Sequence, residues 1–159
     1  MTSINTDPTQ QALQKFKSLS VDDQLAFLWF VYTEMGKSIT PAAPGSAAPE
    51  IAEGLFNQVK EKSHDEQLQI MRDLATNADT LISREYGSLS DNTKLLFWYR
   101  LSQGMDSQTI VPMPPNYEMA DAGNQLLEEV KGFEFNQQIT FLRDTVMPMG
   151  AEAKGGSDI

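Results

Sequence analysis

The amino-acid sequence predicts an all-α fold, and three observations carry that prediction. Apolar residues recur at helical spacing, for example at Leu25, Trp29 and Tyr32, which places them on one face of a helix. Residues that can cap a helix, such as Ser, Thr and Asp, stand before several of these segments. No segment combines sustained alternation of apolar and polar residues with β-branched side chains, so we expect no sheet.

Eight helices are expected, and punctuation in the sequence marks most of their starts. Asp7 followed by Pro8 is typical of an N-cap and a first helical position, and Ser63 with Glu66 forms a capping box. Gly36 is expected to end the second helix. The expected ranges are about 8–19, 21–35, 49–62, 64–77, 80–86, 91–105, 119–131 and 134–146.

Two proline-rich loops, 38–49 and 106–117, separate these helices into three blocks. Loops of this length are uncommon in compact domains and are often functional. The arrangement fits two helical bundles that meet across a groove better than one simple bundle. We expect residues 1–150 to form a single domain and residues 151–159, rich in Gly and Ala, to form a flexible tail.

The composition excludes several classes of function. The chain has 159 residues, and 12 basic against 22 acidic residues give a net charge of −10, which argues against binding nucleic acid. The absence of cysteine excludes disulfides and cysteine-bound metals. No apolar run approaches the roughly 18 residues of a membrane span, and the polar N-terminus does not resemble a signal peptide. We therefore expect a cytoplasmic protein that does not span a membrane.

The sequence offers little for catalysis. His64 is the only histidine, and Glu61-x-x-His64 supplies only half of a di-iron carboxylate motif. We expect His64 to be exposed and predict no metal site. No nucleophile elbow, P-loop or dinucleotide-binding motif is present. The sequence therefore predicts no catalytic residues and a protein that is not an enzyme.

Two aromatic segments stand out, and they have two interpretations. LAFLWFVYTEM (25–35) and LLFWYRL (95–101) contain both tryptophans of the chain. An ordinary helical core is the simpler interpretation. Trp and Tyr, however, carry polar edges that need partners when buried, and 8 methionines accompany them, including Met71, Met105 and Met113. Soft thioethers beside flat aromatic rings favour a slender apolar ligand.

At these residues the sequence resembles the N-terminal helical domain of the orange carotenoid protein family, and its single-domain relatives, the helical carotenoid proteins. The resemblance covers about residues 16–150. The motifs that carry it are DDQLAFLWFVYTEMGKSIT with AAPG (22–45), MRDLATNADT (71–80), SDNTKLLFWYRL (90–101), VPMPPNY (111–117), and QQITFLRDTV with MG (137–150).

The resemblance implies two interleaved four-helix bundles with a keto-carotenoid, of the canthaxanthin or echinenone type, in the groove between them. The family tends to have isoleucine where this chain has Leu28 and Met113, and both exchanges preserve an apolar side chain of similar volume. The residues expected to contact the carotenoid are Leu25, Leu28, Trp29, Tyr32, Met71, Leu95, Trp98, Tyr99, Met105, Met113, Pro114, Tyr117 and Arg143.

The function implied is carotenoid binding for photoprotection, by quenching singlet oxygen, by storing and carrying the pigment, or both. Two alternatives stay open. One is a quencher that binds the phycobilisome, with Lys15, Lys17 and Arg143 as a local basic patch on an acidic protein. The other is a helical adaptor with an ordinary core. The quenching role would place the protein near thylakoid membranes or phycobilisomes.

Partners follow from the same resemblance. In the parent protein the chain continues into a C-terminal domain that contacts the carotenoid, whereas this sequence ends at Ile159. We therefore expect one end of the ligand to be exposed or covered by a partner. A separate homologue of that C-terminal domain, acting as a carotenoid donor, and a second copy of this chain in a homodimer are the two candidates.

Overall fold

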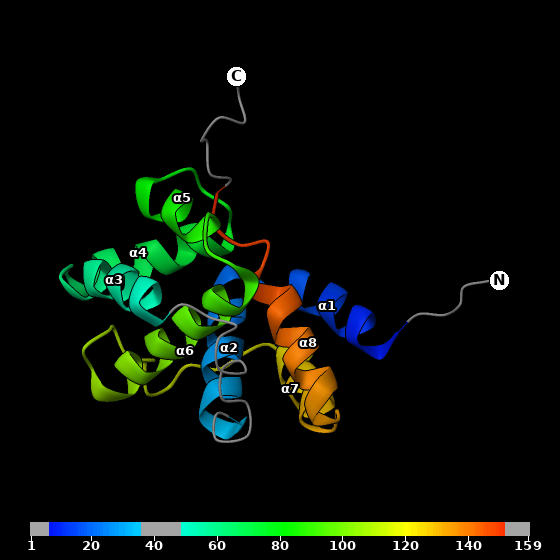
Figure 1. The fold of residues 1–159 in the computed structure, drawn as a ribbon. Helices are drawn as coiled ribbons and strands as arrows, with labels where there is room; N and C mark the ends of the chain where they lie inside the picture. Colours follow the sequence, from blue (N-terminus) through cyan, green and yellow to red (C-terminus); the bar gives the residue numbers. More distant parts are fainter. Residues whose placement is uncertain (1–6, 36–48, 152–159) are drawn as a thin grey trace.

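The structure is a computed structural model that describes residues 7–35 and 49–151. In these residues it contains helices and no strands (Figure 1), so the predicted all-α fold is confirmed. Gly36, the loop at 38–48 and the tail at 152–159 lie outside the described residues. The helices are α1 (Pro8–Lys17), α2 (Val21–Met35), α3 (Pro49–Lys60), α4 (His64–Ala75), α5 (Leu81–Gly87), α6 (Asp91–Ser107), α7 (Asp121–Lys131) and α8 (Phe135–Val146).

The helices form two groups that interleave along the chain. Helices α1, α2, α7 and α8 pack together, and α3, α4, α5 and α6 form the second group (Figure 1). Helix α2 also contacts α4 and α6, and α6 contacts α8. Because the whole second group lies between α2 and α7 in the sequence, the first group is completed only at the C-terminal end. This is the arrangement of two interleaved four-helix bundles.

Two predicted helix starts, at Asp7 and Ser63, are confirmed by their caps, whereas α7 begins at Asp121, two residues after its predicted start. The Asp7 carboxylate accepts a hydrogen bond from the Thr9 amide at 3.1 Å, and Ser63 with Glu66 forms both bonds of a capping box. Helix α6 runs two residues beyond its predicted end. It ends where Gln108 adopts a left-handed conformation, with φ of 68°, which satisfies the last turn without a glycine.

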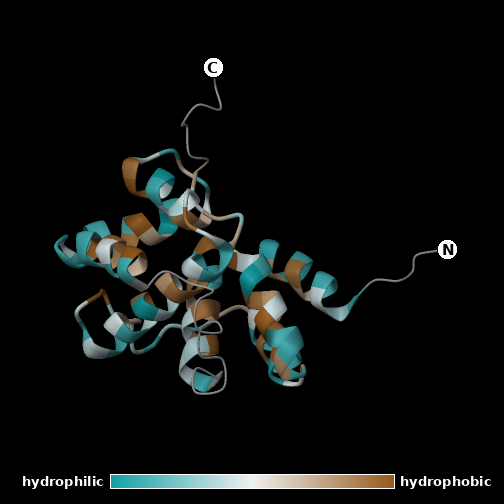
Figure 2. Ribbon diagram, viewed as in Figure 1, coloured by the Kyte–Doolittle hydropathy of each residue, from teal (hydrophilic) through white to brown (hydrophobic). Residues whose placement is uncertain are grey.

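The first bundle has an aromatic core. The rings of Phe16, Phe27 and Phe141 meet edge to face, with centroids 5.6–6.4 Å apart, and join α1, α2 and α8. Such ring pairs each contribute about 0.5–1.5 kcal/mol beyond their buried area. Figure 2 shows hydrophobic positions where the helices face one another and hydrophilic positions over their outer turns.

The segment that follows α8 ties the first bundle to the second. The Gly150 amide donates to the Leu74 carbonyl at 2.8 Å, and the Lys94 ammonium donates to the Met147 carbonyl at 2.7 Å. Gly150 has φ of 79°, and a Cβ there would lie 2.6 Å from the Tyr86 ring. Glycine is therefore required where this segment passes Tyr86. The two hydrogen bonds of the segment hold the bundles against each other.

Candidate functional site: an apolar groove between the bundles

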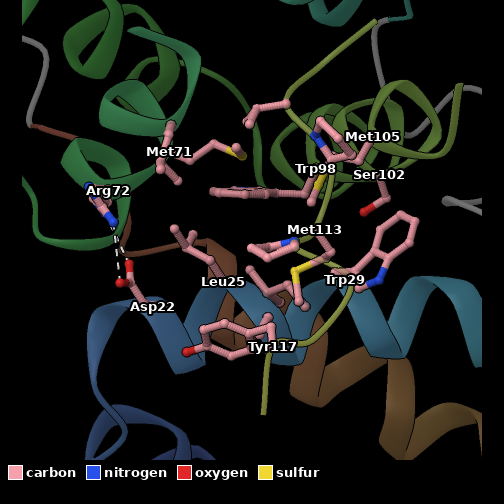
Figure 3. Close-up of a pocket in the computed structure, with 16 residues that line it drawn as sticks. Asp22, Leu25, Trp29, Met71, Arg72, Trp98, Ser102, Met105, Met113 and Tyr117 are labelled. Atoms are coloured by element: carbon pink, nitrogen blue, oxygen red, sulfur yellow. Dashed lines mark hydrogen bonds and ion pairs between the residues drawn. The ribbon is translucent and has the colours of Figure 1, made fainter. Parts of the chain in front are cut away.

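An apolar pocket lies where the two bundles meet. It encloses about 140 Å³ between α2, α4, α6 and the segment 111–117 (Figure 3). Ligand pockets in proteins are mainly apolar with a few polar groups, and this one has that character. Its lining residues are Asp22, Leu25, Ala26, Leu28, Trp29, Leu68, Met71, Arg72, Trp98, Ser102, Met105, Val111, Pro112, Met113, Pro114 and Tyr117.

Most residues that the sequence singles out come together in this lining. They arrive from three helices and one loop, which the sequence stripes alone could not show to be adjacent. The nine are Leu25, Leu28, Trp29, Met71, Trp98, Met105, Met113, Pro114 and Tyr117. Seven further lining residues were not predicted: Asp22, Ala26, Leu68, Arg72, Ser102, Val111 and Pro112.

Four predicted residues lie outside the lining. Leu95 is fully buried, and its carbonyl accepts a hydrogen bond from the Tyr32 hydroxyl at 3.2 Å. Burial raises the pKa of Tyr32, whose ring lies 5.8 Å from that of Tyr99. Arg143 lies in α8, and its buried Nε makes no hydrogen bond with the described residues. Their contact with a carotenoid stays a prediction.

Two aromatic residues of the lining, Trp98 and Tyr117, direct their polar atoms to partners in the protein. The Trp98 Nε1 donates to the Tyr86 hydroxyl at 3.0 Å, and that hydroxyl donates to the Val146 carbonyl at 2.6 Å. The Tyr117 hydroxyl donates to the Asp23 carboxylate at 2.6 Å. Because these polar atoms are satisfied, the rings can offer apolar surface to the groove.

If α2 is counted as one wall of the groove and α4 with α6 as the second, the segment 111–117 is the third wall. Asp23 holds one end of this segment. Its carboxylate is buried and accepts hydrogen bonds from the Tyr117 hydroxyl and, at 3.1 Å, from the Ala120 amide. Burial, and next the hydrogen bond to Asp23, raise the pKa of Tyr117 to about 12. The Asp23 amide also donates to the Ser20 hydroxyl at 3.2 Å, at the start of α2.

Gln67 holds the other end of the same loop. Its side chain is 1% exposed, its Oε1 accepts from the Val111 amide at 2.8 Å, and its Nε2 donates to the Thr109 carbonyl at 3.3 Å. The same Nε2 also donates to the carbonyl of Lys62 at 3.1 Å. A buried glutamine surrounded by backbone groups acts as a clamp, and no pattern in the sequence marks it.

A charged pair lies at one end of the groove. The Arg72 Nε and Nη2 lie 3.0 and 3.2 Å from the two carboxylate oxygens of Asp22, so the pair is bidentate and joins α4 to α2. Figure 3 shows this pair at one end and Trp29 with Ser102 at the other. The hydrogen bond to Asp22 raises the pKa of Arg72, which stays charged at any physiological pH.

Other kinds of site find no support in the described part of the chain. His64 is exposed at the start of α4, as predicted. Within residues 7–35 and 49–151 no group of His, Asp and Glu side chains is placed to hold a metal ion. No helix in the same ranges is long and apolar enough to cross a bilayer.

Comparison with known proteins decides the family. Residues 2–152 match the family described as "Orange carotenoid protein, N-terminal". The chain belongs to the orange carotenoid protein family. The resemblance inferred from the sequence motifs is therefore confirmed, and the family is one of carotenoid-binding proteins, not of enzymes.

Two relatives within the orange carotenoid protein family differ in how much of their own length this chain covers. It is 54% identical over 146 residues to an orange carotenoid-binding domain-containing protein of Nostoc sp., covering 92% of this chain and 85% of the relative. It is 40% identical over 151 residues to the orange carotenoid-binding protein of Synechocystis sp., covering 95% of this chain and 48% of that protein. The chain thus spans about half the length of the Synechocystis protein.

Solved structures of the family match the fold closely. The red carotenoid protein of Anabaena (Nostoc) sp., solved binding canthaxanthin, superposes with a TM-score of 0.84 at 54% identity, over 92% of this chain and 100% of that one. The orange carotenoid protein of the same organism, also binding canthaxanthin, gives a TM-score of 0.82 at 43% identity, over 91% of this chain and 47% of that one.

Proposed function

We propose that the chain binds one keto-carotenoid in the groove between its bundles and uses the pigment in photoprotection. One observation carries the proposal. The apolar groove faced by Trp29 and Trp98 lies in a chain that is 54% identical to a protein solved with canthaxanthin. The pigment class proposed is the canthaxanthin or echinenone type.

The lining residues fit such a ligand. A conjugated polyene is long, thin and apolar, so it needs flat and deformable surfaces on several sides. Trp29 and Trp98 supply flat rings from α2 and α6, and Met71, Met105 and Met113 supply flexible thioethers. Polar atoms of Trp98 and Tyr117 are bonded elsewhere, which spares the polyene contact with unsatisfied donors.

A carotenoid is longer than the lined part of the groove, so the proposed binding site includes residues beyond the lining. Along α2 the lining runs from Asp22 to Trp29, which is about 10 Å of helix at 1.5 Å per residue. A carotenoid is about 30 Å long, roughly the length of a 20-residue helix. We propose that the ligand continues past Trp29 toward Tyr32 and Tyr99, which adjoin the groove in sequence on α2 and α6.

The pigment supplies the photochemistry and the protein supplies the site. A bound carotenoid accepts excitation energy from singlet oxygen and releases it as heat. The lining residues hold the polyene apart from water, and the clamps at Asp23 and Gln67 keep the third wall in place. No side chain has to donate or accept a proton.

The test is expression in cells that synthesise canthaxanthin, followed by gel filtration and a visible absorption spectrum. We expect a coloured protein with about one pigment per chain. When an illuminated sensitiser generates singlet oxygen, this protein should slow the consumption of a chemical trap that reacts with singlet oxygen. A protein that stays colourless in pigment-producing cells would contradict the proposal and favour a helical adaptor. A coloured protein that leaves the trap unprotected would favour storage and transport of the pigment.

Roles with partners are proposals of lower priority. Antenna quenching would need contact with the phycobilisome, yet the net charge is −10, and Lys15 of the predicted basic patch is paired with Glu129 at 2.7 Å. Fluorescence of isolated phycobilisomes with added pigmented protein tests this role. Mixing the chain with a pigmented homologue of the C-terminal domain tests delivery, and gel filtration at several concentrations tests a homodimer.

A further inference from the structure

The groove is apolar except at its ends, and the two ends differ in their hydrogen-bond donors. Among the polar residues of the lining, Asp22 can only accept, and the Tyr117 hydroxyl already donates to Asp23. Ser102 and Trp29, at one end, carry neutral donors (Figure 3). Arg72, at the other end, is the cation of the lining. The two ends of a bound ligand would therefore meet different chemistry.

Arg72 is held in place while part of its donor capacity stays free. The two hydrogen bonds to Asp22 use Nε and Nη2 and leave Nη1 without an acceptor among the described residues. The bidentate pair fixes the guanidinium plane against α2. The Arg72 side chain is 40% exposed and that of Asp22 49%, so the pair contributes little to stability. Stability therefore does not explain why this ion pair lies in the groove lining.

We propose that Arg72, positioned by Asp22, selects a ligand ring that carries a keto oxygen over an unsubstituted ring. This inference rests on the proposed function, because it assigns an orientation and a selectivity to the same groove. The ring keto oxygen accepts a hydrogen bond from the Arg72 guanidinium, and the polyene runs from this end between Trp98 and Trp29. Arg72 is then a specificity-determining residue of the site.

The physical reason is a difference in desolvation. Any ring that covers this end removes water from the exposed part of the Arg72–Asp22 pair. A keto oxygen replaces the lost water with an acceptor, whereas a hydrocarbon ring leaves the donor unsatisfied, which is unfavourable. Hydrogen bonds to a charged donor are stronger than those to a neutral one, so Arg72 discriminates more than Ser102.

The experiment is a competition between two pigments that differ in the keto group. The purified colourless chain is incubated with equal amounts of canthaxanthin and β-carotene, the protein is isolated by gel filtration, and the extracted pigments are quantified. Wild type is expected to retain canthaxanthin over β-carotene by roughly tenfold or more, the factor expected of one hydrogen bond to a charged donor. Arg72→Met keeps the length and apolar character of the stem and is expected to lose most of that ratio.

Two controls separate selection from folding. Arg84→Met removes a comparable exposed arginine, 41% exposed and paired with Asp79 at 2.8 Å, outside the groove, and is expected to keep the wild-type ratio. Ser102→Ala removes one of the two neutral donors at the far end and is expected to change the ratio less than Arg72→Met does. Circular dichroism checks that each variant keeps its helices.

A vibrational measurement supplies a readout that a merely structural role would not change. A hydrogen bond lowers the C=O stretching frequency of the bound keto-carotenoid, and Arg72→Met should raise it again. An unchanged pigment ratio and an unchanged C=O frequency in Arg72→Met would overturn the inference and leave the proposed function intact. A wild type that retains neither pigment would overturn both.

Discussion

The indole Nε1 of Trp98 lies 3.0 Å from the hydroxyl oxygen of Tyr86, a residue that does not line the groove. The Tyr86 hydroxyl in turn donates a hydrogen bond to the Val146 carbonyl in the other bundle. One tryptophan is thus part of the groove by its ring and part of the contact between bundles by its N–H. Its orientation depends on a residue twelve positions earlier.

Tyr86→Phe should therefore destabilise the protein more than a hydroxyl deletion usually does. The change leaves the Trp98 N–H and the Val146 carbonyl buried without this partner, and we expect a loss of about 1–3 kcal/mol in the free energy of unfolding. Urea denaturation followed by circular dichroism measures it. The control is Tyr99→Phe, because the Tyr99 hydroxyl makes no hydrogen bond with the described residues. Equal losses in the two variants would contradict the prediction.

The sequence predicted the local features of the fold well because their causes are local. The capping box at Ser63 joins residues three positions apart, so its pattern is visible in any short window. The end of α6 was missed by two residues, because Gln108 takes a left-handed conformation that is more usual for glycine or asparagine.

The groove was predicted only in part, for a reason of distance along the chain. Aromatic stripes on α2 and α6 show which faces are apolar, and these faces do meet. The clamps depend on Asp23 and Gln67, whose partners lie 94 and 44 positions away. Arg72 stands inside a family-like motif and is partly exposed, so nothing in its surroundings along the chain points to the groove. Side-chain pairing across such separations follows from the tertiary fold and not from local periodicity.

Asp23→Ala should loosen the third wall of the groove. It removes the acceptor of the Tyr117 hydroxyl and of the Ala120 amide, and we expect a loss of about 2 kcal/mol in the free energy of unfolding because the lost bonds are to a charged group. The pigmented variant should also release carotenoid faster to added detergent micelles. Glu118→Ala, an exposed acidic residue of the same segment, is the control. Pigment release at the wild-type rate would show that the wall does not depend on this clamp.

The same contact predicts a specific alkaline sensitivity. The pKa of Tyr117 is raised from 10.0 to about 12 in the folded protein. Between these values the unfolded chain loses the proton while the folded chain keeps it, so the free energy of unfolding falls as pH rises. Below pH 10 the contribution is fully present. Tyr117→Phe lacks this group and should show a flatter decline.

Thermal unfolding of wild type and Tyr117→Phe at several pH values between 10 and 12 makes this comparison. Tyr32 and Tyr86 also have raised pKa values and are present in both proteins. Only the difference between the two curves therefore reports on Tyr117. Parallel curves across this range would contradict the assigned contact between Tyr117 and Asp23.

Two aromatic residues of α6, Phe97 and Tyr99, can test whether the carotenoid extends past the groove lining. Phe97 is fully buried and packs against Tyr86 and Trp98, with ring centroids at 5.6 and 6.3 Å. Phe97→Ala should cost about 3–5 kcal/mol, as expected for a core aromatic residue. Tyr99 is only partly buried beside Tyr32, so Tyr99→Ala should cost less.

For the rate of pigment release, the order of the two variants should be the reverse of their order in lost stability. If the carotenoid extends past Trp29 to the Tyr32–Tyr99 pair, Tyr99→Ala removes a ring from its path and should release pigment several times faster than wild type. Phe97 lies outside the lining, so Phe97→Ala, measured well below its unfolding temperature, should hold pigment longer than Tyr99→Ala does. Stability from urea denaturation and pigment release to detergent micelles, taken on the same samples, give the two orders. Wild-type release in Tyr99→Ala would mean that the ligand ends at Trp29, and that the motif around Tyr99 serves packing alone.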